Sequence, residues 1–332
     1  QIMKKLSLIL IGLLLIPTLF LTSCDKGDDV QVVQTPAQTL MADYMLTANL
    51  DLPNVDTSVA GAKFVAGPPA TEADLPAFLA KYYIIDIRGA ADYTTSHIAG
   101  AKNVAFANIL AEGVLAGSKP VLIVCYTGQT ACYATALMRM YGFKETQALK
   151  WGMSGWNSTT ATSWNNNIGN IAEGNSNWSY DAAPANQVFT KPAFTSLSTS
   201  GEAILKKRVE DVIAEGFKTA KGSDVLATPS NYFINNFFSS ADYTAFGHIK
   251  GAYRINPLSI ADNSVLALDP TAKVVTYCYT GQTSAVITAW LRVLGYDAYS
   301  LSFGMNGMYN NNTAWTSNKW SSSVSKSLPF GN

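Results

Sequence analysis

Two nearly identical stretches decide how this chain is organised: VCYTGQT at residues 124–130 and YCYTGQT at residues 277–283. Each contains one cysteine, Cys125 or Cys278, in the same six-residue frame, and the two cysteines are 153 positions apart. A match at this separation within one chain predicts two copies of a whole domain rather than a stack of short repeats.

The similarity between the two copies extends beyond the cysteine frame. ADYTTSHIAGA at 91–101 corresponds to ADYTAFGHIKGA at 241–252 with one inserted residue. WGMSGW at 151–156 corresponds to FGMNGM at 303–308. The duplication therefore covers most of each expected domain and not only its cysteine loop.

Each copy has the order strand, loop, helix, strand. The apolar runs KPVLIVC and KVVTYC are typical of strands buried on both faces, and each cysteine stands at the end of its strand. The helices expected next finish at Gly142 and Gly295, where a left-handed cap fits. This order predicts an α/β fold in which helices cover a parallel sheet and sites form beyond the carboxyl ends of the strands.

Length and composition limit the classes of function. The chain has 332 residues, of which 48% are apolar, and it carries 23 basic and 23 acidic residues. This is sufficient for two packed domains. Nothing indicates a nucleic-acid partner, because such a partner favours a strongly basic face.

The first residues have the features of a secretory signal. Two lysines precede an apolar run that Pro17 interrupts, and the run is short for a transmembrane helix. It ends in LTSC, which resembles the lipobox of bacterial lipoproteins, with Cys24 as the lipidated residue. We therefore expect a signal peptide at residues 1–23 and, at Cys24, an anchor in membrane lipid that holds the protein outside the cytoplasm. Simple secretion is the alternative.

The remaining chain divides into a tether and two domains. Residues 24–40 are polar and aperiodic, which predicts a flexible tether. The domains are predicted at residues 41–190 and 191–332, each ending in an extension rich in Asn, Ser and Thr. Tryptophans within the extensions indicate ordered packing, so we expect each extension to close its own domain, with ligand binding as the alternative role.

The cysteine loops suit the chemistry of a negatively charged sulfur. A thiol attacks as its thiolate, and a free cysteine has a pKa of about 8.5. A loop between a strand end and a helix N-terminus surrounds the sulfur with backbone N–H groups, which form a nest for anions. Gly128 and Gly281 permit the left-handed backbone that a nest needs, and Thr130 and Thr283 can donate a hydroxyl or cap the helix. The nest is expected to stabilise a thiolate or a persulfide anion without a metal or a cofactor.

These residues resemble the rhodanese family. The resemblance rests on YYIIDIRGAADYTTSHIAGAKNV, VLIVCYTGQTA and LKWGMSGW in the first copy, and on GHIKGA, CYTGQTS and FGMNGM in the second. It covers roughly residues 65–155 and 225–310. It implies two tandem rhodanese-like domains, each with a central parallel β-sheet flanked by helices. It also implies transfer of a sulfane sulfur, through a persulfide on the loop cysteine, to cyanide or a thiol.

By this resemblance, Cys125 and Cys278 carry the sulfur, and Asp86 and Arg88 form a supporting ion pair. The residues that would cradle the sulfur are Tyr126, Thr127, Gly128, Gln129 and Thr130 in the first copy, and Tyr279, Thr280, Gly281, Gln282 and Thr283 in the second.

The chain departs from the family pattern in three respects. Tandem members commonly keep the cysteine only in the second copy, whereas this chain has it in both. Asn236 and Phe238 occupy the positions of Asp86 and Arg88 in the second copy, so that ion pair is absent and we expect the first copy to contribute more. Both loops lack Arg and Lys, which weakens the case for thiosulfate and leaves polysulfide, a protein persulfide or a selenium analogue as equal candidates.

Other kinds of cysteine site fit less well. A cysteine-loop phosphatase needs Arg six residues after the cysteine, where this chain has Ala131 and Ser284. A Cys–His hydrolase would use His97 and His248, but their spacing to the cysteines differs and local hydrogen bonds are the expectation for both. With two histidines in the chain and no Cys-x-x-Cys, no metal site is expected.

Cys132 has no counterpart in the second copy. It follows Cys125 by seven residues, which on a helix is about 10 Å and too far for a disulfide. We expect a buried small apolar residue, with a resolving thiol as the alternative. Inert burial also remains an alternative for the two loop cysteines themselves.

The sequence thus predicts a lipid-anchored sulfurtransferase outside the cytoplasm. Its expected partners are a small sulfur-containing anion or a protein persulfide, and envelope redox proteins. The alternative is a non-catalytic carrier of sulfur or selenium, or a docking subunit of a membrane-associated redox assembly.

Overall fold

The computed structural model describes residues 35–331. Cys24, the expected signal peptide at 1–23 and the tether as far as residue 34 lie outside the described residues. Helix α1 spans Ala37–Thr47, so residues 37–40, which we expected to be part of the tether, belong to a helix. No helix within residues 35–331 is both long and apolar enough to cross a bilayer.

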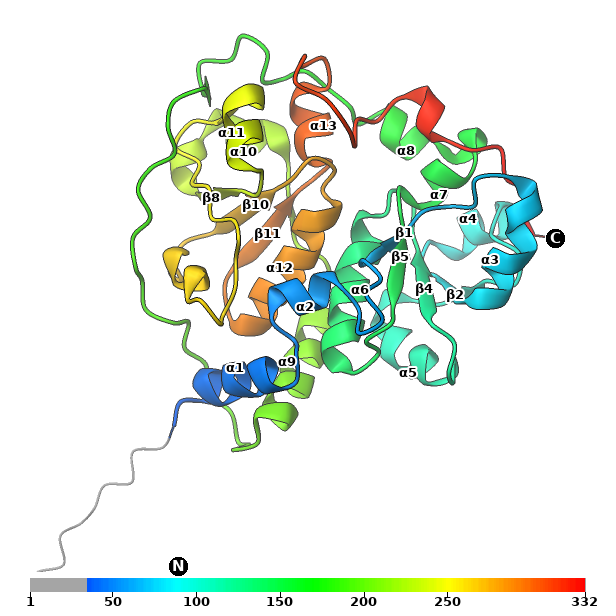
Figure 1. Ribbon diagram of the computed structural model, residues 1–332, viewed down its shortest axis with the longest axis horizontal. Helices are drawn as coiled ribbons and strands as arrows, with labels where there is room; N and C mark the ends of the chain where they lie inside the picture. Colours follow the sequence, from blue (N-terminus) through cyan, green and yellow to red (C-terminus); the bar gives the residue numbers. More distant parts are fainter. Residues whose placement is uncertain (1–34, 332) are drawn as a thin grey trace, which may run out of the picture. The chain divides into compact units, whose positions relative to one another are not determined.

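The first half contains a five-stranded parallel sheet (Figure 1). Its strands are β1 (Val65–Ala66), β2 (Tyr83–Asp86), β3 (Lys102–Asn103), β4 (Val121–Val124) and β5 (Gln147–Leu149). They lie in the order β1-β5-β4-β2-β3, which puts the strand before Cys125 at the centre. The expected parallel sheet is confirmed, and the carboxyl end of its central strand carries the first cysteine loop.

The second half repeats this arrangement. Its parallel sheet has the order β7-β11-β10-β8, formed by β7 (Thr219–Ala220), β8 (Phe233–Asn236), β10 (Val274–Tyr277) and β11 (Ala298–Leu301). Asn235 also makes an isolated parallel bridge to Tyr253, at the edge that β3 occupies in the first half. Strand β10 leads into Cys278 as β4 leads into Cys125.

Alternate residues of the central strand face two apolar layers, which is the period of a strand buried on both sides. In β4, Val121 and Ile123 face one layer and Leu122 and Val124 the other. The first layer includes residues of α5 (Ile109–Val114) and α6 (Gln129–Tyr141). The opposite layer includes residues of α3 (Leu75–Lys81), α4 (Ala90–Thr95) and α7 (Gly152–Trp156).

The second sheet is covered in the same way. On one face lie α9 (Gly201–Glu215) and α12 (Gln282–Leu294). On the other lie α10 (Gly222–Ala227), α11 (Ser240–Phe246) and α13 (Gly304–Tyr309).

One apolar core joins the two halves. Helices α6 and α12, which follow the two cysteine loops, pack directly against each other, as Figure 1 shows. Helix α1 packs on α9, and α2 (Leu52–Asp56) contacts both α6 and α12. Asp51, the N-cap of α2, accepts hydrogen bonds from Ile260 and Ala261 of the second half. The N-terminal segment of the first half is therefore tied to the second.

The two Asn- and Ser-rich extensions are partly exchanged between the halves. The first contains α8 (Thr162–Asn165) and then crosses to the second half, where β6 (Trp178–Ser179) pairs antiparallel with β9 (His248–Ile249). The C-terminal tail returns to the first half, where Leu328 joins its core and accepts a bond from Asn157 (Figure 1). Each extension packs on its own half, as expected, through Trp164 in the first and Trp315 in the second, and also reaches the opposite half. The crossing could not be predicted, because local composition does not reveal which core a segment's apolar side chains reach.

Candidate active site

The first cysteine loop turns sharply from β4 into α6. Gly128 adopts a left-handed conformation with φ of 86°, which a residue with a side chain rarely adopts. The turn directs two backbone N–H groups at the sulfur of Cys125: Gly128 N at 3.1 Å and Ala131 N at 3.3 Å. The loop therefore forms a cradle of amide hydrogens around the sulfur.

The second loop holds its cysteine with a different set of donors. Gly281 repeats the left-handed turn with φ of 76°. Cys278 Sγ accepts a hydrogen bond from Ser284 N at 3.3 Å and donates one to Ser284 Oγ at 3.7 Å. Ser284 Oγ is linked in turn to Ser300 Oγ at 2.8 Å. A serine pair thus supports the second sulfur where the first has a second backbone amide.

Both sulfurs are buried, since Cys125 is 2% exposed and Cys278 is 3% exposed. Burial raises the pKa of the Cys125 thiol, although the amides of Ala131, Thr127 and Gly128 act in the opposite direction. We expected the nest to favour the thiolate of the free enzyme. In this closed arrangement desolvation outweighs the amides, so the free cysteine favours its neutral thiol.

The expectation that Thr130 and Thr283 cap their helices is wrong, because neither helix has a side-chain cap at its N-terminus. Gly128 and Gly281 are the N-cap residues. The side-chain oxygen of Thr127 accepts from Gln129 N at 3.5 Å, and that of Thr280 accepts from Gln282 N at 3.2 Å. Thr130 and Thr283 come after the first residue of each helix, too late in the chain for this position.

The tyrosines next to the cysteines point to acidic partners. Tyr126 donates to Asp92 Oδ2 at 2.5 Å, and Tyr279 donates to Asp242 Oδ2 at 2.5 Å. These carboxylates raise the pKa of both phenols, although burial is the larger cause. A carboxylate beside each cysteine loop opposes the approach of a multiply charged anion, and the sequence analysis did not single out either aspartate.

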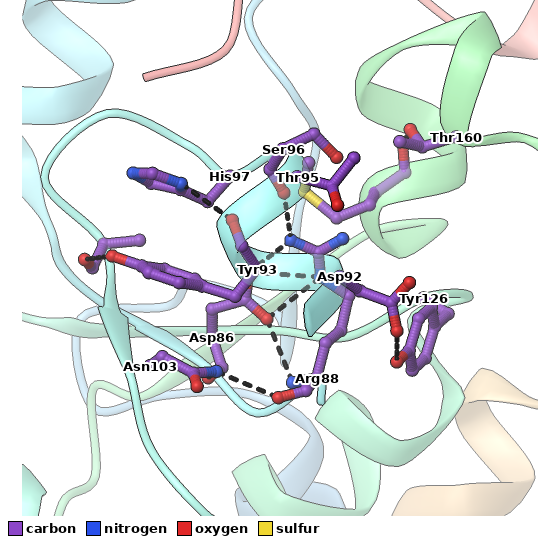
Figure 2. Close-up of polar contacts among 12 residues, drawn as sticks. Asp86, Arg88, Asp92, Tyr93, Thr95, Ser96, His97, Asn103, Tyr126 and Thr160 are labelled. Atoms are coloured by element: carbon purple, nitrogen blue, oxygen red, sulfur yellow. Dashed lines mark hydrogen bonds and ion pairs between the residues drawn. The ribbon is translucent and has the colours of Figure 1, made fainter. Parts of the chain in front are cut away.

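Asp86 and Arg88 form the expected ion pair in the first half (Figure 2). Asp86 accepts from both Nε and Nη2 of Arg88, and its Oδ1 also accepts from Arg88 N at 3.0 Å. In the second half, Asn236 Oδ1 keeps the backbone bond by accepting from Phe238 N at 2.9 Å. The Phe238 ring stacks on Tyr279 at 4.4 Å, so aromatic packing supports the second loop where an ion pair supports the first.

A polar pocket of about 450 Å³ lies beside the first loop. Arg88, Asp92 and Tyr126 line it, and Figure 2 shows these side chains together with Ser96 and Thr160. Its other hydroxyl-bearing residues are Thr95, Ser96, Thr159, Thr160, Thr162 and Ser163. The buried Phe238 occupies the sequence position of Arg88 in the second half, so the two loops have different surroundings.

Each histidine makes a local hydrogen bond, as we expected. His97 Nδ1 is 2.9 Å from Tyr93 O and His248 Nδ1 is 3.4 Å from Tyr243 O, and each ring stacks on the same tyrosine. Within residues 35–331 there is no cluster of three or more His, Cys, Asp or Glu side chains that could hold a metal ion.

Cys132 is a fully buried free thiol in α6, which confirms the expected burial. Burial raises its pKa, and the nearby Cys125 and Cys278 add to the effect. Such a thiol is poorly suited to act as a nucleophile in this conformation.

Known proteins that are similar to this chain include sulfurtransferases. The rhodanese-like domain family matches residues 71–159 and 237–311, once in each half. The thiosulfate sulfurtransferase GlpE of Pseudomonas fluorescens is 33% identical over 78 residues, which are 23% of this chain and 71% of that protein.

Solved structures of two further sulfurtransferases are similar to longer parts of the chain. A thiosulfate sulfurtransferase from Pseudomonas aeruginosa is 16% identical, with a TM-score of 0.29, over 86% of this chain and 49% of that one. The 3-mercaptopyruvate sulfurtransferase SseA of Escherichia coli is 15% identical, with a TM-score of 0.27, over 76% of this chain and 99% of that one. From the repeated domain match and the GlpE relative, the chain belongs to the rhodanese-like family and contains two rhodanese domains.

Proposed function

We propose that this protein transfers sulfane sulfur through persulfides on its loop cysteines, with Cys125 as the principal carrier. The observation that carries the proposal is the pair of amides, Gly128 N and Ala131 N, directed at Cys125 Sγ. Hydrogen bonds from backbone amides are stronger to an anionic acceptor than to a neutral one. The loop is therefore suited to hold a sulfur that alternates between thiolate and persulfide.

The proposed reaction has two balanced steps. In the first, the Cys125 thiolate attacks the outer sulfur of a donor R–S–S⁻, forms Cys–S–S⁻ and releases R–S⁻. In the second, an acceptor thiolate or cyanide attacks that outer sulfur, receives it and releases the Cys125 thiolate. Both steps exchange one sulfur–sulfur bond for another bond to sulfur, so no external oxidant or reductant is consumed.

The surroundings of the first loop favour particular donors and acceptors. The loop lacks Arg and Lys, Asp92 lies beside it, and Asp86 neutralises the buried Arg88. These features favour a singly charged donor group, such as a hydrogen polysulfide anion or a protein persulfide, over the dianion thiosulfate. The hydroxyl-lined pocket beside Tyr126 gives a small polar acceptor a place to approach the first loop.

Cyanolysis tests this function. Wild type is expected to release thiocyanate repeatedly from a sulfane donor and cyanide. Cys125→Ser is expected to lose most of the turnover, and the double variant Cys125→Ser/Cys278→Ser all of it. Full turnover by the double variant would refute the proposal.

Intact mass identifies the class of donor, and steady release of thiocyanate separates an enzyme from a carrier. Incubation with polysulfide, and separately with thiosulfate, is expected to add one sulfur mass per loaded cysteine, and polysulfide is expected to load more. A carrier would gain the same mass but stop after one transfer per cysteine, without steady release of thiocyanate.

The cellular location is part of the same proposal. The signal-like pattern before Cys24 supports an anchor in the membrane lipid outside the cytoplasm, where envelope redox proteins are candidate partners. When the full chain is expressed in a bacterium, Cys24→Ser is expected to move the protein from the membrane to the soluble fraction, and an unchanged membrane fraction would contradict the anchor.

A further inference from the structure

Two glutamines cross the contact between the halves in a reciprocal way. Gln129 is the first residue of α6 and Gln282 is the first residue of α12, and both side chains are buried. Gln129 Oε1 accepts a hydrogen bond from Phe303 N of the second half at 2.7 Å. Gln282 Oε1 accepts one from Trp151 N of the first half at 3.2 Å. Each glutamine therefore belongs to one cysteine loop and bonds to the opposite half.

The backbone that Gln282 binds is the turn that supports the first loop. Trp151 and Gly152 both have left-handed conformations, with φ of 67° and 59°. The turn brings Met153 N to the carbonyl oxygen of Cys125 at 2.9 Å. A side chain on Gly152 would place its Cβ 2.4 Å from that oxygen, so the contact with the loop is close.

The second half has the same arrangement. Phe303 and Gly304 are left-handed, with φ of 62° and 51°. Met305 N donates to the carbonyl oxygen of Cys278 at 2.9 Å, and a Cβ on Gly304 would lie 2.2 Å from that oxygen. A left-handed conformation is costly for Trp or Phe and persists only when its surroundings hold it. The glutamine of the opposite loop provides one such hold in each half.

The glycines of the two cysteine loops also leave room for the glutamine of the opposite half. A Cβ on Gly128 would lie 2.8 Å from Gln282 Oε1, and a Cβ on Gly281 would lie 2.3 Å from Gln129 Oε1. These glycines thus serve both the left-handed turn and the close approach of the opposite glutamine. The two cysteine loops touch through these contacts.

We propose that Gln129 and Gln282 are positioning residues that act across the contact, so that each cysteine loop depends on the glutamine of the other. This inference rests on the proposed sulfur transfer and deepens it, since it makes the two sulfur sites one coupled unit. A persulfide on one cysteine alters its loop, and the change reaches the other loop through the shared glutamine contacts.

The two directions of the coupling are unequal. Gln129 Nε2 donates to Thr127 Oγ1 at 3.2 Å within its own loop. Gln282 Nε2 is buried without an acceptor among the described residues, and the hydrogen bond of Gln282 to the opposite half is the longer of the two. Gln282 is thus the less firmly held of the pair, and the shorter bond of Gln129 links the second loop more firmly to its partner.

Variants that keep only one loop cysteine test whether each glutamine acts on the opposite cysteine loop. In Cys278→Ser protein, Gln282→Met removes the acceptor of Trp151 N while leaving the first loop's own residues unchanged. The alkylation rate of Cys125 is expected to fall by about fivefold, the factor that one net hydrogen bond is worth. Its pH profile should move to higher pH. Gln129→Met in Cys125→Ser protein is the reciprocal test on Cys278.

Matched controls distinguish this role from a general loss of structure. Gln187→Met makes the same substitution at an exposed position outside both cysteine loops and is expected to leave the Cys125 rate unchanged. Gln282→Glu keeps a side-chain oxygen that can accept from Trp151 N and is expected to recover part of the rate. Equal Cys125 rates in the Gln282→Met protein and its parent would overturn the inference, as would the same loss in Gln187→Met.

A measurement on the wild-type protein tests the coupling without depending on the folding of any variant. After partial loading with polysulfide, peptide mapping gives the occupancy of each cysteine and intact mass gives the doubly loaded fraction. Independent sites make that fraction equal to the product of the two occupancies, whereas coupled sites make it differ. Equality would overturn the coupling while leaving sulfur transfer intact, and no gain of sulfur on either cysteine would refute the proposed function itself.

Discussion

At the scale of single residues, Cys125 is subject to two opposing effects. Its amide donors favour a charged sulfur, whereas its 2% exposure disfavours any charge. Burial is the larger effect, and the pKa of the free thiol is raised. A persulfide is more acidic than its parent thiol, so it carries a negative charge more readily. The same amides therefore stabilise a charged sulfur more once the outer sulfur is bound. The site is therefore better suited to hold the intermediate than to ionise the resting cysteine.

The raised pKa predicts the pH dependence of Cys125. In Cys278→Ser protein, the rate of alkylation at Cys125, followed by peptide mapping, is expected to rise with pH and to reach half its limit above the ordinary cysteine value of about 8.5. Because the pKa of the folded state exceeds that of the unfolded state, the thiol stabilises the fold below the ordinary value. That stabilisation is lost as the pH rises towards the folded-state pKa. A midpoint below the ordinary value would contradict this reading.

At the scale of elements, the corner between β2 and α4 and its counterpart between β8 and α11 solve the same packing problem in two ways. The first half uses the buried pair of Asp86 and Arg88, and the second half uses Asn236 with the stacked ring of Phe238. In both halves, the side chain of the first residue, Asp86 or Asn236, accepts a hydrogen bond from the backbone N–H two residues later. The backbone turn is thus maintained in both halves, and the ion pair is one of two ways to complete it.

This comparison predicts how the first half responds to substitution. Arg88→Phe alone leaves the buried Asp86 without its partner and is expected to lower the free energy of unfolding by about 3–5 kcal/mol. The double variant Asp86→Asn/Arg88→Phe copies the second half and is expected to recover most of that loss. Urea unfolding measures both. If the double variant were as unstable as the single one, the corner would need the ion pair itself.

At the scale of the whole molecule, each half is completed by chain that belongs to the other. The apolar core containing α6 and α12 is continuous, the segment through β6 joins the second half, and Leu328 lies in the core of the first. Such shared burial predicts that the two domains unfold together in one cooperative transition.

A single residue of the tail tests that cooperation. Leu328→Ala is expected to cost about 2–5 kcal/mol, the usual loss for a buried leucine, even though residue 328 is remote in sequence from the core that it fills. Ser323→Ala, on an exposed part of the same tail, is the matched control and is expected to change little. Two separate unfolding transitions, with only one affected by Leu328→Ala, would show that the halves are independent.

Several features could be predicted from the sequence because they depend on local pattern. Residues close together in the chain predict the strands before Cys125 and Cys278, the left-handed Gly128 and Gly281, and the pairing of Asp86 with Arg88. The duplication follows from the match between two such short stretches. Hydrophobic periodicity, glycine conformation and family motifs each involve only a few neighbouring residues, so they can be recognised in a single sequence.

Other features were decided only by the tertiary structure. Each of these features joins residues that are distant in the chain. They are the net effect of burial on Cys125, the aspartates beside Tyr126 and Tyr279, the exchange of the extensions, and the hydrogen bonds of Gln129 and Gln282 to the opposite half. No short-range pattern encodes such pairings, because they depend on which surfaces meet when both cores form. The sequence by itself determined what each cysteine loop is, and the packing of the two halves decided what surrounds each sulfur.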